Sequence, residues 1–152
     1  YVPYVVETPI GLDRMFLAML SNAYTEENVP DAEGKDSTRV VLKFHPALAP
    51  VKCAILPLLK NNDDLTAMAR DIFDDLKYSF LCQYDEKDAI GRRYRRQDAI
   101  GTPYCVTVDH QSLEDQTITI RERDTMHQER IHISKVKDLV EQRIAFRSLF
   151  GN

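Results

Sequence analysis

The sequence predicts an α/β domain built in three layers, with a mixed sheet of five strands and flanking helices. Residues 51–108 alternate between apolar runs and helical patterns, in the order strand, helix, strand, helix, strand. That order implies parallel strands joined by crossover helices. Two runs of alternating polar and apolar residues, 116–123 and 129–133, come next and predict an antiparallel hairpin. The hairpin makes the expected sheet a mixed one.

The first part of the chain has a different pattern. Residues 4–7 are apolar and β-branched up to a glutamate, so we expect a strand there. From Gly11 to Ala23 apolar residues recur every three or four positions, which predicts a helix. Residues 25–37 lose this periodicity and are acidic, so we expect an exposed loop. Residues 39–44 are a short strand candidate.

A segment bracketed by prolines, residues 45–50, is typical of a linker between domains. We therefore divide the chain into a first unit, residues 1–45, and an α/β domain, residues 46–152. The chain starts with Tyr1, inside a strand-like run, and we expect it to be part of a longer protein.

The strands of the α/β domain are apolar runs of ordinary strand length. Residues 51–56 are almost continuously apolar, which is typical of a strand buried on both faces of a sheet. Residues 80–84 and 104–108 are the next candidates, and an arginine-rich helix that ends at Gly101 lies between them.

Two further helices are predicted by apolar stripes and capping residues. Asp63 or Asp64 is the expected N-cap of the first, and Ser134 that of the last. The two stripes consist of Leu65, Met68, Ala69, Ile72 and Leu76, and of Val136, Leu139, Val140 and Ile144.

The composition limits the classes of function. Apolar residues make up 43% of the chain, enough for a packed core, and the net charge of −4 means that any polyanion site is local. No apolar run approaches the ~20 residues of a membrane span. Each cysteine lies in an apolar run and none has metal-ligand spacing to a histidine, so we expect buried, reduced thiols, no metal site and a cytoplasmic protein.

The densest basic cluster lies on the predicted arginine helix and consists of Arg92, Arg93, Arg95 and Arg96. On a helix, Arg92, Arg95 and Arg96 share one side. Guanidinium groups suit phosphate because their fork of donors matches its oxygens. The alternative is an ordinary solvated helix face with Asp98 and Glu86 as ion-pair partners.

A second charged cluster ends the first strand of the predicted hairpin and consists of Arg121, Glu122, Arg123 and Asp124. Strand alternation puts Arg121 and Arg123 on the face opposite Ile118 and Ile120. Arginines donate to base edges and carboxylates accept from them, so this cluster is a candidate for reading bases. The alternative is a salt-bridged edge strand that resists aggregation.

A third pair stands near the N-terminus. Glu7 ends a predicted strand and Arg14 comes after Gly11 at the start of a predicted helix. A carboxylate and a guanidinium at such a place can hold an amine and a phosphate. The alternative is that both are ordinary surface charges.

These segments resemble a known family. Glu7-Thr-Pro-Ile-Gly-Leu-Asp-Arg14 is similar to motif 3 of class II aminoacyl-tRNA synthetases, so residues 1–45 would be the strand–helix remnant at the C-terminal end of their catalytic domain. Residues 46–152 resemble their C-terminal anticodon-binding domain. Three segments narrow the resemblance to the dimeric glycyl-tRNA synthetase family: residues 48–58, residues 90–103, and Arg121-Glu-Arg-Asp-Thr-Met126.

The resemblance implies roles for particular residues. Arg14 would bind the γ-phosphate of ATP, Glu7 would hold the glycine ammonium group, and Gly11 belongs to the same motif. Pro9 stands where the family usually has serine. Arg121 and Arg123, with Glu122 and Asp124, would read the two cytosines that glycine anticodons share. The helix of residues 92–96 would contact the RNA backbone or a neighbouring domain.

The resemblance also implies partners. The whole enzyme would be a cytoplasmic homodimer that uses Mg²⁺ and ATP to activate glycine and transfers it to tRNA(Gly), without binding membranes or DNA. Motifs 1 and 2 are missing from this chain, so we expect it to be inactive alone. The alternatives are a non-catalytic accessory or dimerisation module with the same fold, and another class II synthetase: the prolyl, threonyl or histidyl enzyme.

Overall fold

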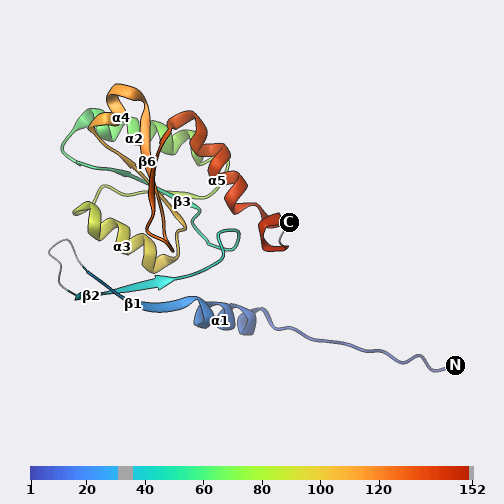
Figure 1. The fold of residues 1–152 in the computed structure, drawn as a ribbon. Coiled ribbons are helices and arrows are strands. Elements are labelled where there is room, and N and C mark those ends of the chain that lie inside the picture. Colours follow the sequence, from blue (N-terminus) through green and yellow to red (C-terminus); the bar gives the residue numbers. More distant parts are fainter. Residues whose placement is uncertain (31–35, 151–152) are drawn as a thin grey trace.

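The computed structural model describes residues 1–30 and 36–150 of the chain. A central sheet carries helices on both faces, and a two-stranded hairpin lies below the lower helix layer (Figure 1). Among the described residues, no helix is long and apolar enough to cross a membrane.

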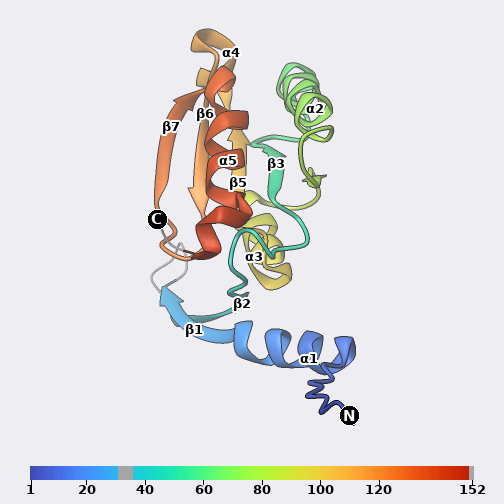
Figure 2. The ribbon, with the colours of Figure 1, turned by 90° about the vertical axis from the view of Figure 1, so that its right-hand side faces the viewer.

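The sheet is mixed and has five strands in the order β4-β3-β5-β6-β7, which confirms the prediction. The strands β3 (Cys53–Pro57), β4 (Cys82–Tyr84) and β5 (Tyr104–Val108) are parallel. The strands β6 (Thr117–Glu122) and β7 (Gln128–His132) continue the sheet in antiparallel pairing. The view along the sheet shows β7 at one edge (Figure 2).

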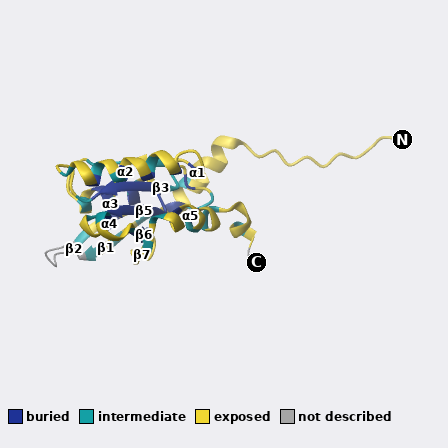
Figure 3. Cartoon of the chain, turned by 90° about the horizontal axis from the view of Figure 1, so that it is seen from above, coloured by how far each residue is buried: buried dark blue, intermediate teal, exposed yellow. Residues whose placement is uncertain are grey.

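The strands β3 and β5 are buried along their whole length, because helices cover both faces of the sheet (Figure 3). Cys53, Ile55 and Val106 belong to the larger core cluster, on the side of the helices α2 (Asp63–Leu76) and α5 (Val136–Ile144). The other faces of the same strands pack with α3 (Ile90–Ile100) in a smaller cluster that contains Ala54, Leu56, Cys105, Ile90 and Tyr94.

The N-cap of helix α2 lies one residue before the first of the two predicted cap residues. Asn62, rather than Asp63 or Asp64, is the N-cap, and its side chain accepts a hydrogen bond from the Leu65 backbone N–H at 3.1 Å. The two aspartates occupy the first turn, where carboxylates stabilise the helix N-terminus. The predicted stripe is confirmed, with Leu65, Ala69, Ile72 and Leu76 buried and Met68 partly buried.

Replacing the N-cap tests this assignment. Asn62→Ala is expected to lower the free energy of unfolding by about 1 kcal/mol, because the Leu65 N–H loses its partner. Urea unfolding measures the change. Asp63→Ala is the control and should cost clearly less, since Asp63 caps nothing; a larger loss for Asp63→Ala would contradict the assignment.

Two further helix starts differ from prediction. The last helix, α5, is preceded by a 3-10 turn, η1 (Ile133–Lys135), so Ser134 lies inside the turn and does not cap α5. The His132 side chain caps η1 instead, by accepting from the Ser134 N–H. A short helix, α4 (His110–Asp115), was not predicted, because six residues are too few to show a helical period. A second 3-10 turn, η2 (Phe146–Phe150), comes after α5.

Asp109 fixes the start of α4 and ties it to β7. Its carboxylate accepts from the Ser112 backbone N–H and forms a two-point ion pair with Arg130, with both N–O distances at 2.8 Å. The hydrogen bonds from Arg130 are the main reason why the pKa of Asp109 falls to about 2.

This ion pair predicts a pH dependence of stability. A folded-state pKa of about 2, below the ordinary ~3.9 of the unfolded chain, means that the unfolded state takes up the proton first as pH falls. The contribution is therefore complete above about pH 5 and lost as pH approaches 2. The difference in unfolding free energy between the original chain and Arg130→Met is expected to be about 1–2 kcal/mol at pH 6 and to shrink toward zero at pH 2. A difference that does not change with pH would contradict the prediction.

The N-terminal part departs most from prediction. Residues 1–11 have no regular structure, so the strand expected at residues 4–7 is wrong. A strand needs a neighbour for its backbone hydrogen bonds, and none of the described strands pairs with these residues. The helix α1 (Leu12–Ala23) is confirmed, although Ala23 is its one buried residue and Phe16 is 62% exposed.

The loop expected at residues 25–37 is a hairpin instead. The strands β1 (Tyr24–Pro30) and β2 (Asp36–Leu42) pair in antiparallel register, and residues 31–35 lie outside the described part. Acidic residues fit this strand because Glu27 stands directly opposite Arg39 and pairs with it at 2.8 Å. The strand expected at residues 39–44 is thus confirmed as part of β2.

Residues 43–52, which contain the predicted linker, have no helix or strand. The hairpin before them nevertheless packs against α3 of the α/β domain, where Arg39 forms an ion pair with Asp98 at 2.8 Å. The division into residues 1–45 and 46–152 stays a prediction.

Candidate nucleic-acid interface

Helix α3 carries the arginine cluster, and its end is fixed by glycine. Gly101 has a φ of +84°, in the left-handed region that glycine adopts without strain. A Cβ atom at this position would lie 2.7 Å from the Phe44 ring and 3.0 Å from the Leu42 carbonyl oxygen. The hairpin β1–β2 therefore approaches the end of α3 as closely as a glycine permits.

Three arginines of α3 face solvent, as the helical spacing predicts: Arg92, Arg95 and Arg96. Arg95 donates to the Ser37 hydroxyl at 2.6 Å. Arg96 pairs with Asp85 and Asp88, each at 2.9 Å, and not with Asp98 or Glu86, the partners named for the alternative of a solvated helix face. Arg92 has no hydrogen bond to another described side chain. Arg92 and Arg95 are therefore open to an anionic ligand, whereas the guanidinium donors of Arg96 are already used by Asp85, Asp88 and the Lys87 backbone oxygen.

The fourth arginine of the cluster, Arg93, is buried and serves the fold. Its guanidinium donates to the backbone oxygens of Pro57 and Leu58, where β3 ends, and to that of Asp85. Burial lowers the pKa of Arg93. Its Nε is buried and has no hydrogen-bond partner among the described residues.

Asp98, on the buried side of α3, is the centre of an ion-pair network. Its carboxylate accepts two hydrogen bonds from Arg121, at 2.9 and 3.1 Å, and one from Arg39 at 2.8 Å. The side chains of Asp98 and Arg39 are 1% and 2% exposed. Tyr94 adds a cation–π contact, with its ring centroid 4.7 Å from the Arg121 Cζ.

The Arg121 side chain is therefore buried, and its guanidinium is paired within the protein. Burial alone would lower the pKa of its guanidinium, but the hydrogen bonds and charge of Asp98 outweigh that effect and the pKa is raised. The strand β6 that carries it lies between β5 and β7, so the alternative of an edge strand is wrong. Arg121 joins β6 to α3 and, through Asp98, to the hairpin β1–β2.

Arg123 holds together the same three parts of the fold. Its guanidinium donates to the backbone oxygens of Gly101 at 2.8 Å and Phe44 at 2.7 Å, and it pairs with Asp124 at 2.8 Å. Its own backbone oxygen accepts from Arg39. The side chain is 2% exposed, whereas that of Asp124 is 43% exposed. Arg121 and Arg123 share one face of the strand, but that face is covered.

Glu122 points to the other face and lines a cavity of about 500 Å³ where β6 ends. Glu129 and Arg143, both half-buried, line the same cavity and form an ion pair at 3.1 Å. The sequence does not reveal these two residues as a pair, because Arg143 comes from the end of α5 and only the fold brings it to β7. The cavity presents carboxylate acceptors beside a guanidinium donor.

The N-terminal candidates are not part of this site. Glu7 and Gly11 lie in the irregular exposed segment and Arg14 lies on the first turn of α1, which is also exposed. The segment projects away from the sheet (Figure 1). Arg14 forms no ion pair with another described residue.

The cysteines are internal or partly internal. Cys53 and Cys105 are buried, and burial raises the pKa of the Cys105 thiol to about 12 and that of Cys53 well above its usual value. Their thiols are therefore protonated at neutral pH. The described residues contain no group of three metal-ligating side chains.

The fold agrees with the match to a known family. Residues 52–143, more than half of the chain, match the family model described as an anticodon binding domain. The chain therefore belongs to the family of anticodon-binding domains.

Three similar relatives of this chain are all glycine–tRNA ligases. The chain is 50% identical over 145 residues to the glycine–tRNA ligase of Thermobifida fusca, with 95% of the chain and 31% of that protein covered. The glycine–tRNA ligase of Mycolicibacterium vanbaalenii is 52% identical over 144 residues, and that of Staphylococcus saprophyticus 49% over 146 residues, with 31% and 30% of their lengths covered. The chain thus spans about a third of the length of these relatives.

A solved structure supports the fold. The prolyl-tRNA synthetase from Cryptosporidium parvum, complexed with L-proline and AMP, superposes with a TM-score of 0.62 over 72% of this chain and 24% of that protein. At 22% sequence identity, this likeness bears on the fold alone.

Proposed function

We propose that this chain is the anticodon-reading part of a cytoplasmic, homodimeric glycine–tRNA ligase, whose partners are glycine, ATP and tRNA(Gly). The observation that carries the proposal is identity of 49–52% to glycine–tRNA ligases over 95–96% of the chain. The same relatives favour the glycyl enzyme over the prolyl, threonyl and histidyl alternatives.

We further propose that this chain alone does not activate glycine. ATP and Mg²⁺ require several converging anionic and cationic groups, whereas Glu7 and Arg14 are both exposed and neither forms an ion pair with a described residue. The residues present therefore do not form a site for ATP with its metal ion. In the whole enzyme, Glu7, Gly11 and Arg14 would contribute to that site.

The RNA backbone would lie against α3. Arg92, Arg95 and Arg96 are exposed and share one side, and the guanidinium groups of Arg92 and Arg95 are open to phosphate oxygens. Arg121 and Arg123, whose side chains are 6% and 2% exposed, would instead anchor the helix and the hairpin.

The bases would be read at the edge where β6 ends. The carboxylates of Glu122 and Glu129 can accept from the N4 amino group of cytosine, and the Arg143 guanidinium can donate to its O2. Asp124 stands at the same turn and is exposed enough to accept as well. Helix α3 ends beside this edge, because Gly101 is hydrogen-bonded to Arg123. One RNA loop can thus contact both.

Salt dependence of binding tests the α3 surface. Arg92→Ala should weaken binding of an anticodon stem-loop about equally for all sequences and reduce the slope of log affinity against log salt by about 0.7–0.9, the share of one phosphate contact. Fluorescence anisotropy at several salt concentrations measures the slope. Arg70→Ala is the control, because Arg70 is an exposed arginine on α2, which covers the other face of the sheet, and it should leave the slope unchanged. An unchanged slope for Arg92→Ala would place the RNA elsewhere.

A further inference from the structure

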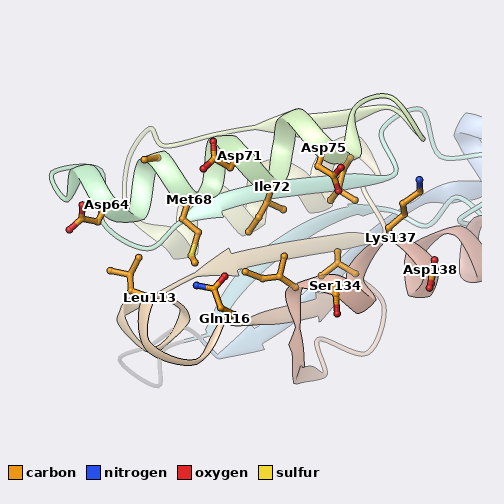
Figure 4. A pocket seen from close by; sticks show the side chains of 14 residues that line it. Asp64, Met68, Asp71, Ile72, Asp75, Leu113, Gln116, Ser134, Lys137 and Asp138 are labelled. Carbon is orange, nitrogen blue, oxygen red and sulfur yellow. The ribbon is translucent and has the colours of Figure 1, made fainter.

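A groove separates α2 from the opposite wall formed by α4, η1 and the start of α5 (Figure 4). Its volume is about 810 Å³. The floor is apolar: Ile72, Leu76 and Val136 are buried at its base, and Met68, Leu113 and Ile133 are partly buried along its walls. The groove can therefore receive apolar side chains from another molecule.

The rim of the groove is acidic. Asp64, Asp71 and Asp75 line it from α2 and Asp138 from α5, against a single cation, Lys137. All four carboxylates are on exposed residues, and none forms an ion pair with a described residue. The three aspartates of α2 lie along one side of the helix over about 16 Å, at 1.5 Å per residue. Their charge is thus available to a partner that lies along α2.

The position of the groove excludes RNA as its occupant. It lies on the face of the sheet covered by α2 and α5, whereas the exposed arginines are on α3 at the other face (Figure 1). The cavity lined by Glu122 and Arg143 is at the opposite end of α5. A row of carboxylates repels phosphates. A molecule in this groove leaves the proposed RNA contacts free.

We propose that this groove docks a basic amphipathic helix of a partner protein. Apolar side chains on one face of that helix would enter the groove, and its lysines or arginines would meet Asp64, Asp71 and Asp75. A second copy of this chain fits less well. Its exposed apolar helix is α1, whose charged residues are Asp13 and Arg14, so α1 has no excess positive charge to complement the rim.

A synthetic peptide tests the proposal on the 152-residue chain. The probe is a fluorescent peptide of about two heptads of leucine and lysine, patterned so that one helical face is apolar. Its binding is monitored by anisotropy and mapped by chemical-shift changes of backbone amides. We expect saturable binding with the changes confined to α2, α4, η1 and the first turn of α5. A peptide with glutamate in place of lysine should not bind.

Variants of the rim distinguish binding in the groove from nonspecific attraction of the peptide to an acidic surface. Asp71→Asn combined with Asp75→Asn should weaken the peptide about tenfold. Ala67→Arg, at an exposed lining position that folding does not depend on, should do the same by repulsion and bulk. Asp74→Asn is the matched control, because Asp74 is on α2 but pairs with Lys77 and does not line the groove, and it should have no effect.

Three outcomes would overturn the proposal. The first is equal weakening by Asp74→Asn, which would mean nonspecific charge attraction. The second is a set of chemical-shift changes in α2, α4 and η1 when an anticodon stem-loop is added without the peptide, which would make RNA the occupant. The third is a concentration-dependent dimer, seen by sedimentation and abolished by Ala67→Arg, which would make a second copy the occupant.

Discussion

Asp98→Ala is expected to lower the free energy of unfolding by about 3–5 kcal/mol. The variant leaves the buried guanidinium groups of Arg39 and Arg121 without their shared carboxylate. An unpaired buried charge costs far more than the pair itself contributes. Urea unfolding measured by circular dichroism gives the value.

Asp88→Asn is the matched control for this prediction, because it removes the charge while asparagine tolerates the left-handed backbone at this position, where φ is +71°. Asp88 also pairs with an arginine, Arg96, but the two side chains are 42% and 44% exposed, so its loss should cost less than about 1 kcal/mol. A loss below about 1 kcal/mol for Asp98→Ala as well would show that the network is not buried in solution.

Arg123→Ala is expected to lower the free energy of unfolding by about 2–4 kcal/mol, because the buried oxygens of Gly101 and Phe44 lose their donor. Arg92→Ala removes an exposed arginine of the same size and should change stability by less than about 0.5 kcal/mol. The same urea titration compares the two.

RNA binding by Arg123→Ala shows whether Arg123 only anchors the fold or also reads a base. Under conditions where the variant is folded, its affinity is expected to change equally for stem-loops with and without the two cytosines. A loss of about 1–3 kcal/mol confined to the cytosine-containing stem-loop would restore Arg123 as a base reader.

The central sheet was predictable because its signals are local. The continuous apolar run before residue 57 and the alternation after residue 116 each indicate how many faces of a strand are covered. The hairpin β1–β2 was missed because the stability of that strand pair comes from Arg39, which joins Glu27 across the hairpin and Asp98 in α3. No window of sequence around Glu27 contains that information.

The arginine cluster was predictable as a group, but not the role of each member. Arg93 differs from Arg92 by one position on the helix, and that rotation turns its guanidinium toward the ends of the strands. Arg121 is structural because its partner, Asp98, lies on another element. Which charges are buried depends on tertiary contacts, and sequence alternation shows only which residues share a face.

The central claim is that this chain distinguishes cytosines in an anticodon loop. The direct measurement is an anisotropy titration of the chain, at one stated salt concentration, with a glycine anticodon stem-loop and with the same stem-loop after one cytosine is changed to uracil. Uracil presents an acceptor where cytosine presents its N4 donor, so a carboxylate such as Glu122 loses its partner. We expect binding weaker by about 1–3 kcal/mol, with much of the difference lost in Glu122→Gln. Equal affinity for the two stem-loops would contradict the assignment.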